Sequence, residues 1–151
     1  MNQPSTETGH RERIVRDAER IYHAWDEALG AKDVEASVAL YHPDATLESP
    51  LVCHLLGTDE GVVSGRENLR RFVERVFAHQ PAERRRFRTG YLVGERADGA
   101  LLMWEYPRVT PDGEQMDLVE VMEVRDGLIA HHRVFWGWRA LGVLAGGAHP
   151  R

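Results

Sequence analysis

The amino-acid sequence predicts an α+β fold, with helices in the first half of the chain and an antiparallel sheet in the second. Two observations carry this prediction. Apolar residues recur at steps of three and four as far as Phe77, and four strand-like runs separated by tight turns follow. Because helices and strands are segregated rather than alternating, a wound α/β fold is disfavoured.

The first helix is expected over residues 11–29, where apolar side chains form a single stripe. Gly30 is well placed to end it, because glycine adopts the left-handed conformation of a helix C-cap without strain. Asp33 is the expected N-cap of a second, shorter helix. Pro43 is expected to stop that helix, because proline has no N–H to continue the hydrogen-bond ladder.

Residues 45–49 are expected to form a short strand that Pro50 ends. The stretch 51–64 begins apolar and then becomes rich in glycine, so we expect a loop that covers part of the fold. Gly65 opens a third helix, and its expected buried stripe is Leu69, Phe72, Val73, Val76 and Phe77.

Four strands are expected in the second half of the chain, over residues 87–96, 101–109, 114–124 and 128–138. Short turn sequences rich in glycine, aspartate and proline join them, at 97–99, 110–113 and 125–127. Consecutive hairpins of this kind build a meander of antiparallel strands.

Length, charge and composition limit the possible functions. The 151 residues suit one domain, expected over 11–145 between a disordered tail at 1–10 and a second tail at 146–151. The net charge of −5 argues against nucleic-acid binding, and no run approaches the roughly 20 apolar residues of a membrane span. The polar first segment and the single cysteine, Cys53, favour the cytoplasm.

Four short sequence motifs resemble those of a known fold family: LYHPDAT at 40–46, GRE at 65–67, DGLI at 126–129 and HRVFW at 132–136. In this order and spacing the chain resembles the nuclear transport factor 2-like superfamily, and within it the SnoaL-like and ketosteroid isomerase branch. The resemblance implies a cone-shaped α+β barrel, in which three helices pack on the concave face of a curved antiparallel sheet. It also implies a pocket between them and homodimers formed through the outer sheet face.

Alternation along the third strand singles out Glu120. It shares its parity with Leu118, Met122 and Val124, so this acid lies in an otherwise apolar row that should face the interior. A carboxyl group there must be neutral, paired or functional. The resemblance places it where ketosteroid isomerases carry a protonated acid that donates to an oxyanion. The alternative is a structural Glu120, paired with His132 or an arginine only to satisfy its oxygens.

The last strand brings His132 to the same inner face. His132 should lie within reach of Glu120, and an imidazole beside a carboxyl group suits acid–base chemistry near neutral pH. A purely structural hydrogen bond is the alternative. Phe135 would face the other side, which favours a homodimer through that face because the ring would otherwise meet water. The expected inward row is Leu128, Ala130, His132, Val134 and Trp136.

The second strand leaves two alternatives open. If Glu105 faces inward, the pocket holds two carboxyl groups whose ionisation is pushed apart. If Trp104 faces inward, the pocket is an aromatic box. From the first helix, Tyr22 and Trp25 are expected to point toward the sheet.

Ser49 departs from the pattern of the isomerases, in which an aspartate base precedes the proline of this strand. Serine is not basic enough to remove a carbon-bound proton, so the steroid-isomerase mechanism is not expected in that form. His54, in the expected covering loop, is a candidate replacement base. The histidines and aspartates fit no compact ligand motif, so neither a metal nor a cofactor is expected.

Together these patterns predict acid–base chemistry, such as isomerisation, cyclisation, dehydration or hydration, on a small apolar or cyclic molecule. Glu120 and His132 are the expected catalytic pair, with Glu105 as a further candidate. A non-catalytic ligand-binding module and a dimeric partner module are the alternatives. The expected substrate contacts are Tyr22, Trp25, Ser49, His54, Trp104 and Trp136.

Overall fold

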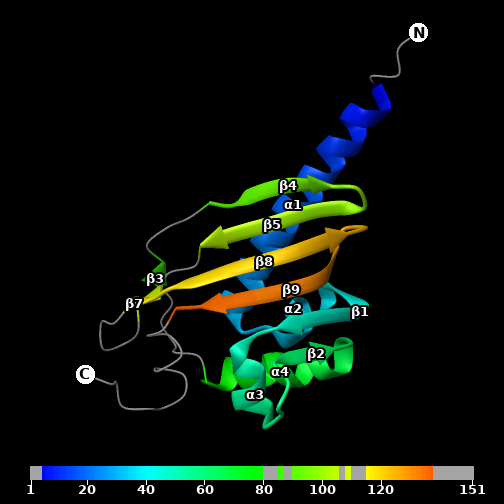
Figure 1. Ribbon diagram of the computed structural model, residues 1–151. Coiled ribbons are helices and arrows are strands. Elements are labelled where there is room, and N and C mark those ends of the chain that lie inside the picture. Colours follow the sequence, from blue (N-terminus) through cyan, green and yellow to red (C-terminus); the bar gives the residue numbers. More distant parts are fainter. Residues whose placement is uncertain (1–4, 80–84, 87–89, 106–107, 110–114, 138–151) are drawn as a thin grey trace.

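A computed structural model describes residues 5–79, 85–86, 90–105, 108–109 and 115–137, which contain four helices and a curled, mixed sheet (Figure 1). The helices lie in the first half of the chain and the long hairpins in the second, so the α+β class is confirmed. Helices α1 (Ser5–Ala31) and α2 (Val34–Ala39) lie behind the sheet in this view. No helix in these ranges is long and apolar enough to cross a membrane.

Helix α1 begins before the expected start at Arg11, so residues 5–10 of the expected tail are helical. It also continues through Gly30, and the left-handed residue after its end is Lys32, with φ of 54°. Asp33 caps α2 as predicted, because its carboxylate accepts a hydrogen bond from the Ala36 amide at 2.9 Å. The buried stripe of α1 is Ile14, Ala18, Ile21, Tyr22, Trp25, Ala28 and Leu29.

Strand β1 (Tyr41–Glu48) starts earlier than expected and contains Pro43, which therefore does not stop the preceding helix. β1 pairs in parallel with β9 (Leu128–Trp136), and the register breaks between Tyr41 and Thr46. Proline is tolerated in this irregular stretch because no regular ladder bond is lost there. The parallel pair makes the sheet mixed, whereas the sequence predicted a purely antiparallel one.

The stretch expected to be a loop forms helix α3 (Pro50–Leu56) and strand β2 (Val62–Ser64). Ser49 caps α3, Pro50 occupies its first turn, and Gly57 ends it in the left-handed conformation. The expected three helices are therefore four in the described part of the chain, with α4 (Arg66–His79) at the predicted place. The stretch 51–56 is therefore a short helix and not a loop, and its Leu51 and Leu55 form part of the cavity wall.

The main sheet has the strand order β2-β1-β9-β8-β5-β4, where β4 is Leu92–Arg96, β5 is Gly99–Glu105 and β8 is Leu118–Arg125. The turns at Ala97–Asp98 and Asp126–Gly127 are confirmed. A small second sheet joins β3 (Arg85–Arg86), β6 (Arg108–Val109) and β7 (Gln115–Met116). The expected turn at 110–113 and the tail at 146–151 lie outside the described residues.

The core lies between the inner face of the main sheet and the helices. Leu102, Met122 and Ile129 of the sheet are fully buried, as are Ile21 of α1 and Leu69 of α4. The helices do not fill all of the space over the inner face, and the space that remains between sheet and helices is the cavity that carries the candidate site.

Gly99, the first residue of β5, offers a test of the hairpin. Its φ is 153°, and a Cβ at this position would overlap the carbonyl oxygen of Val124 on β8. We expect Gly99→Ala to lower the free energy of unfolding by more than about 2 kcal/mol, measured by urea denaturation. Gly94→Ala on β4 is the matched control, because its Cβ would meet nothing closer than Leu101 at 3.8 Å. Equal losses for the two variants would contradict this account.

Candidate functional site

An apolar cavity of about 100 Å³ opens between strands β1, β8 and β9 and the four helices. Because it exceeds the space needed for one water molecule several-fold, it can hold a single-ring molecule. Aliphatic and aromatic side chains make most of its wall. The residues with polar atoms on this wall are Trp25, Ser37, Tyr41, Ser49, His79, Glu120, His132 and Trp136.

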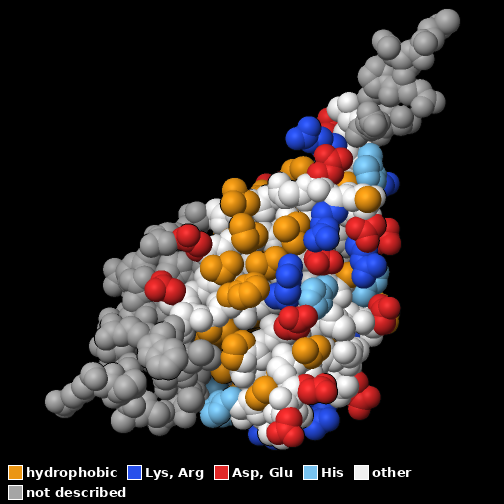
Figure 2. Space-filling model, in the orientation of Figure 1, with side chains coloured by type: hydrophobic (Ala, Val, Ile, Leu, Met, Phe, Trp, Pro, Cys, Tyr) orange, Lys and Arg blue, Asp and Glu red, His pale blue; other side chains and the backbone are white. Residues whose placement is uncertain are grey.

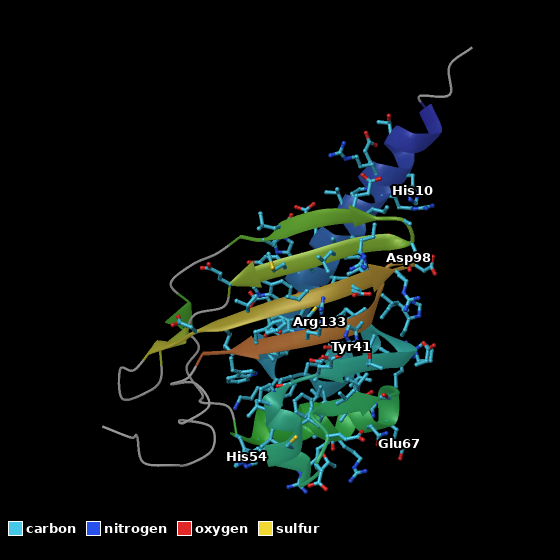
Figure 3. All side chains as sticks on the ribbon, viewed as in Figure 1. His10, Tyr41, His54, Glu67, Asp98 and Arg133 are labelled. Carbon is cyan, nitrogen blue, oxygen red and sulfur yellow. The ribbon has the colours of Figure 1, made fainter. Side chains whose placement is uncertain are left out.

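Glu120, His132 and Tyr41 form a continuous chain of hydrogen bonds on this wall. His132 Nε2 lies 2.6 Å from Glu120 Oε2, and the Tyr41 hydroxyl lies 2.7 Å from His132 Nδ1. The three residues are 4%, 2% and 2% exposed. They come from three neighbouring strands, β8, β9 and β1, so the parallel pairing of β1 with β9 is what adds Tyr41 to the predicted pair. Figure 3 shows Tyr41 in the middle of the molecule, beside β9.

Counting donors and acceptors fixes the direction of these bonds. The Trp25 side chain hydrogen-bonds to Tyr41, and an indole can only donate. The Tyr41 oxygen therefore accepts from Trp25 and donates its own proton to His132 Nδ1. The proton of a neutral imidazole then lies on Nε2, where it is donated to Glu120. This assignment pairs the indole N–H of Trp25, the hydroxyl of Tyr41 and both ring nitrogens of His132, and it leaves Oε1 of Glu120 without a partner in the hydrogen-bond chain.

Tyr41 takes part in this chain as a permanent hydroxyl. Burial raises its pKa far above the ordinary value of 10.0, the charge of Glu120 raises it further, and the hydrogen bond from Trp25 lowers it. Tyr41 therefore remains protonated at neutral pH. It orients the imidazole and does not act as a base.

The inward row of β9 is only partly as predicted. His132, Val134 and Trp136 line the cavity, whereas Leu128 and Ala130 do not. A β-bulge separates the pairs Glu123–His131 and Val124–Ile129, so Ala130 is an extra residue, and Ile129 and Ala130 are both buried. Strict alternation from His132 fails at this point.

Of the two alternatives for β5, the structure has Trp104 and not Glu105 facing inward. Trp104 is 3% exposed and packs edge-on against Trp25, with the ring centroids 5.2 Å apart. Glu105 is exposed and faces away from the cavity, so the expectation that it joins the catalytic group is wrong. Trp104 itself does not line the cavity; it supports the Trp25 ring from behind.

The other expected contacts divide into two groups. Ser49 and Trp136 line the cavity and bond to each other, with Trp136 Nε1 donating to Ser49 Oγ at 3.2 Å. Tyr22 is buried outside the cavity, where its hydroxyl accepts from the Gly90 amide at 3.3 Å. His54 is exposed on α3, does not line the cavity and lies well away from Tyr41 in Figure 3. The proposed replacement base is therefore not in place.

Sequence reasoning missed three polar residues of the wall, Ser37, Tyr41 and His79. Tyr41 is part of the motif at 40–46 but was not singled out, since only its long-range pairing with β9 places it beside His132. His79 ends α4 at the rim, and its Nδ1 bonds to the Arg75 carbonyl oxygen at 2.7 Å. No signal in the sequence marked it. Among the described residues, no group of three or more His, Cys, Asp or Glu side chains is arranged to hold a metal ion.

Replacing Tyr41 tests the hydrogen-bond chain. Tyr41→Phe leaves two buried partners, the Trp25 indole and His132 Nδ1, unsatisfied. We expect a loss of about 1–3 kcal/mol in the free energy of unfolding at neutral pH. The folded-state pKa of Tyr41 lies above its unfolded value of 10.0, so its contribution is complete below pH 10 and declines as the pH rises beyond it. The variant should therefore lose less stability than the wild type above pH 10. A parallel decline of both proteins would disprove the burial of this hydroxyl.

Comparisons with known proteins agree with this architecture. A family model of the SnoaL-like domain matches residues 18–132. No significant match to a curated protein was found. Solved structures at 17–19% identity share the fold.

One of them is a nuclear transport factor 2-like protein of unknown function from Burkholderia pseudomallei, with 17% identity and a TM-score of 0.63 over 85% of this chain and 97% of that one. TerC, co-crystallised with polyporic acid, has 17% identity and a TM-score of 0.63 over 87% and 99%. SalBIII, an epoxide hydrolase/cyclase-like enzyme of pyran ring formation in salinomycin, has 19% identity and a TM-score of 0.57 over 83% and 94%. Since the family model spans most of the sequence, this chain belongs to the SnoaL-like family, and it shares the fold of a nuclear transport factor 2-like protein.

Proposed function

We propose that this chain is an enzyme that moves protons on a small, apolar, ring-bearing substrate, with Glu120 as the acid–base group. The observation that carries the proposal is the buried pair of Glu120 and His132 on the wall of an apolar cavity. Burying two ionisable groups is expensive, and apolar residues of similar volume would stabilise the fold at least as well. A pair kept at this cost beside a space for a ligand points to chemistry.

Each residue of the hydrogen-bond chain has a distinct role. Glu120 meets the substrate; its Oε2 accepts from His132, which leaves Oε1 to take the proton. His132 is a positioning residue that stabilises the carboxylate, and Tyr41 holds the imidazole in the required tautomer. The carboxylate removes a proton from a carbon beside an electron-withdrawing group and returns it to another atom of the same molecule. This is an isomerisation without net gain or loss of atoms or electrons.

The cavity and two of the similar structures support the choice of a cyclic substrate. The wall is mostly aliphatic and aromatic, with Trp25 and Trp136 as its indole surfaces. TerC was crystallised with polyporic acid, and SalBIII is named for pyran ring formation. These two similar structures favour a ring-bearing ligand, and the cavity volume of about 100 Å³ limits that ligand to a single ring.

Glu120→Gln tests the assigned base. With 3-cyclohexenone as the probe, the wild type should accelerate its conversion to 2-cyclohexenone, followed by ultraviolet absorption. The variant should lose roughly 10²–10⁴-fold in kcat/KM, because an amide takes up no proton. Glu105→Gln is the matched control, since it makes the same change on the exposed end of β5 and should leave the rate unaltered. A Glu120→Gln enzyme that keeps the wild-type rate and fold would show that Glu120 is not the base.

We further propose that two copies associate through the outer sheet face. Figure 2 shows apolar side chains gathered over β4, β5, β8 and β9 on this face, with charged groups beside them. Leu92 is 66% exposed and Phe135 is 54% exposed. A contiguous apolar patch on the face opposite the cavity is best satisfied by an identical patch, which buries both.

Phe135→Asp tests this association. Light scattering should give the mass of two chains for the wild type and 17.2 kDa for the variant, because a buried unpaired carboxylate opposes contact. Val15→Asp, on the exposed side of α1, is the control and should leave the mass unchanged. A wild type of single-chain mass, or a variant that still pairs, would refute the proposal.

A further inference from the structure

We infer that Ser49 donates a hydrogen bond to an oxygen atom of the substrate, which makes the substrate a cyclic carbonyl compound. The inference rests on the proposed function, because it names the substrate class of the same cavity. It also assigns a role to the serine that stands where the isomerases have an aspartate.

Ser49 has a buried hydroxyl group that already accepts two hydrogen bonds. It is 4% exposed and borders the cavity. Its Oγ accepts from the Leu51 amide at 3.2 Å and from Trp136 Nε1 at 3.2 Å. A hydroxyl has two acceptor lone pairs and one proton to donate. Both lone pairs are engaged, so the proton points away from these two donors.

The hydroxyl proton has no acceptor among the described residues, since both hydrogen bonds that Oγ makes there are accepted ones. A buried donor without a partner costs free energy, and such groups are rare in folded proteins. In capping α3, the Ser49 hydroxyl only accepts a hydrogen bond, so capping does not explain the unused hydroxyl proton. An oxygen atom of a ligand in the cavity would accept a hydrogen bond from that proton.

The strand register places this donor opposite Glu120. Glu48 pairs with Arg133, so the extended residue Ser49 lies beside Val134, and Val134 pairs with Glu120. Ser49 and Glu120 thus stand on the same inner face, on either side of Val134, which also borders the cavity. Two strand spacings separate their backbones, which is roughly 10 Å. A six-membered ring lying over Val134 can therefore reach both side chains.

This placement defines the reaction more closely. The Glu120 carboxylate takes a proton from the carbon next to the carbonyl. The electron pair of that C–H bond forms a carbon–carbon double bond, and the π pair of the carbonyl group moves onto its oxygen. The Ser49 hydroxyl donates to the oxygen as its negative charge grows. The same proton then returns from Glu120 to another carbon of the conjugated system, and the carbonyl group is restored. In the isomerase pattern the acid at the position of Glu120 is the hydrogen-bond donor, and the aspartate at the position of Ser49 is the base. Here the two roles are exchanged, with Ser49 as the donor and Glu120 as the base.

The test compares two rings of one shape, cyclohexanone and methylenecyclohexane, of which only the ketone can accept a hydrogen bond. Binding to the full-length protein is followed by the fluorescence of Trp25 and Trp136, which line the cavity. The wild type should bind the ketone roughly fivefold more tightly, as expected for one net hydrogen bond. Ser49→Thr keeps the hydroxyl and suits the extended backbone, so it should keep this ratio.

Two further variants separate donation from capping. Ser49→Asp retains an acceptor for Leu51 and Trp136 and is a good N-cap, but it has no proton to donate. Ser49→Ala removes both functions. Both variants should bring the ketone-to-alkene ratio to about one, while Ser49→Asp should retain most of the thermal stability that Ser49→Ala loses. A ketone preference that survives in Ser49→Asp and Ser49→Ala would overturn the inference, as would a wild type without the preference or without measurable binding of the ketone.

The outcome is independent of the catalytic test. Glu120→Gln should keep the ketone preference, because the oxygen binds at Ser49. If Glu120→Gln loses the preference and the Ser49 variants keep it, the oxygen binds on the side of Glu120 and the inference is wrong, whatever the turnover result. If the ketone preference depends on Ser49 but Glu120→Gln retains turnover, the role of Ser49 in binding is supported and the assignment of Glu120 as the base is wrong.

Discussion

The parallel pairing of β1 with β9 is the constraint on which the site depends. It sets Tyr41 beside His132 on one side of the register break in β1, and Ser49 beside Val134 on the other side, so both parts of the cavity wall depend on this strand pair. The hairpin of β8 and β9 then adds Glu120. Because β1 and β9 are about 90 residues apart in sequence, this contact forms only when the whole fold closes, and the site and the core are completed together.

The buried hydrogen-bond chain explains how the fold tolerates a charge in its interior. Donation runs from Trp25 through Tyr41 and His132 to Glu120, so the buried donors of the chain are paired and the Glu120 carboxyl group lies at the end next to the cavity. Behind it, Trp104 packs against Trp25 and fixes the first donor. The aromatic residues of the wall therefore hold the acidic group in one position, in addition to filling space.

The sequence predicted what depends on local patterning and missed what depends on distant contacts. Helix periodicity, the Asp33 cap, the hairpin turns and the inward parity of Glu120 and His132 are local, and the structure has them. The side of β5 that carries Trp104 could not be chosen, because both parities of that strand are partly apolar. Helix α3 was hidden because its cap, Ser49, was assigned to a strand and its apolar run is too short to show a period. Tyr41 was missed because no local signal distinguishes a parallel strand partner from the end of a helix.

The bulge at Ala130 has a consequence for the comparison of this chain with its relatives. If the side chains alternated regularly from Ile129 onward, His131 would face the cavity and His132 would face outward. In the structure His131 faces outward and contacts Glu48. The extra residue exchanges two adjacent histidines between opposite faces of the sheet. An alignment that assumes regular alternation from Ile129 onward would therefore place His131, and not His132, on the inner face of the sheet. A gap placed inside the strand, at 130, preserves the correspondence of the inner faces.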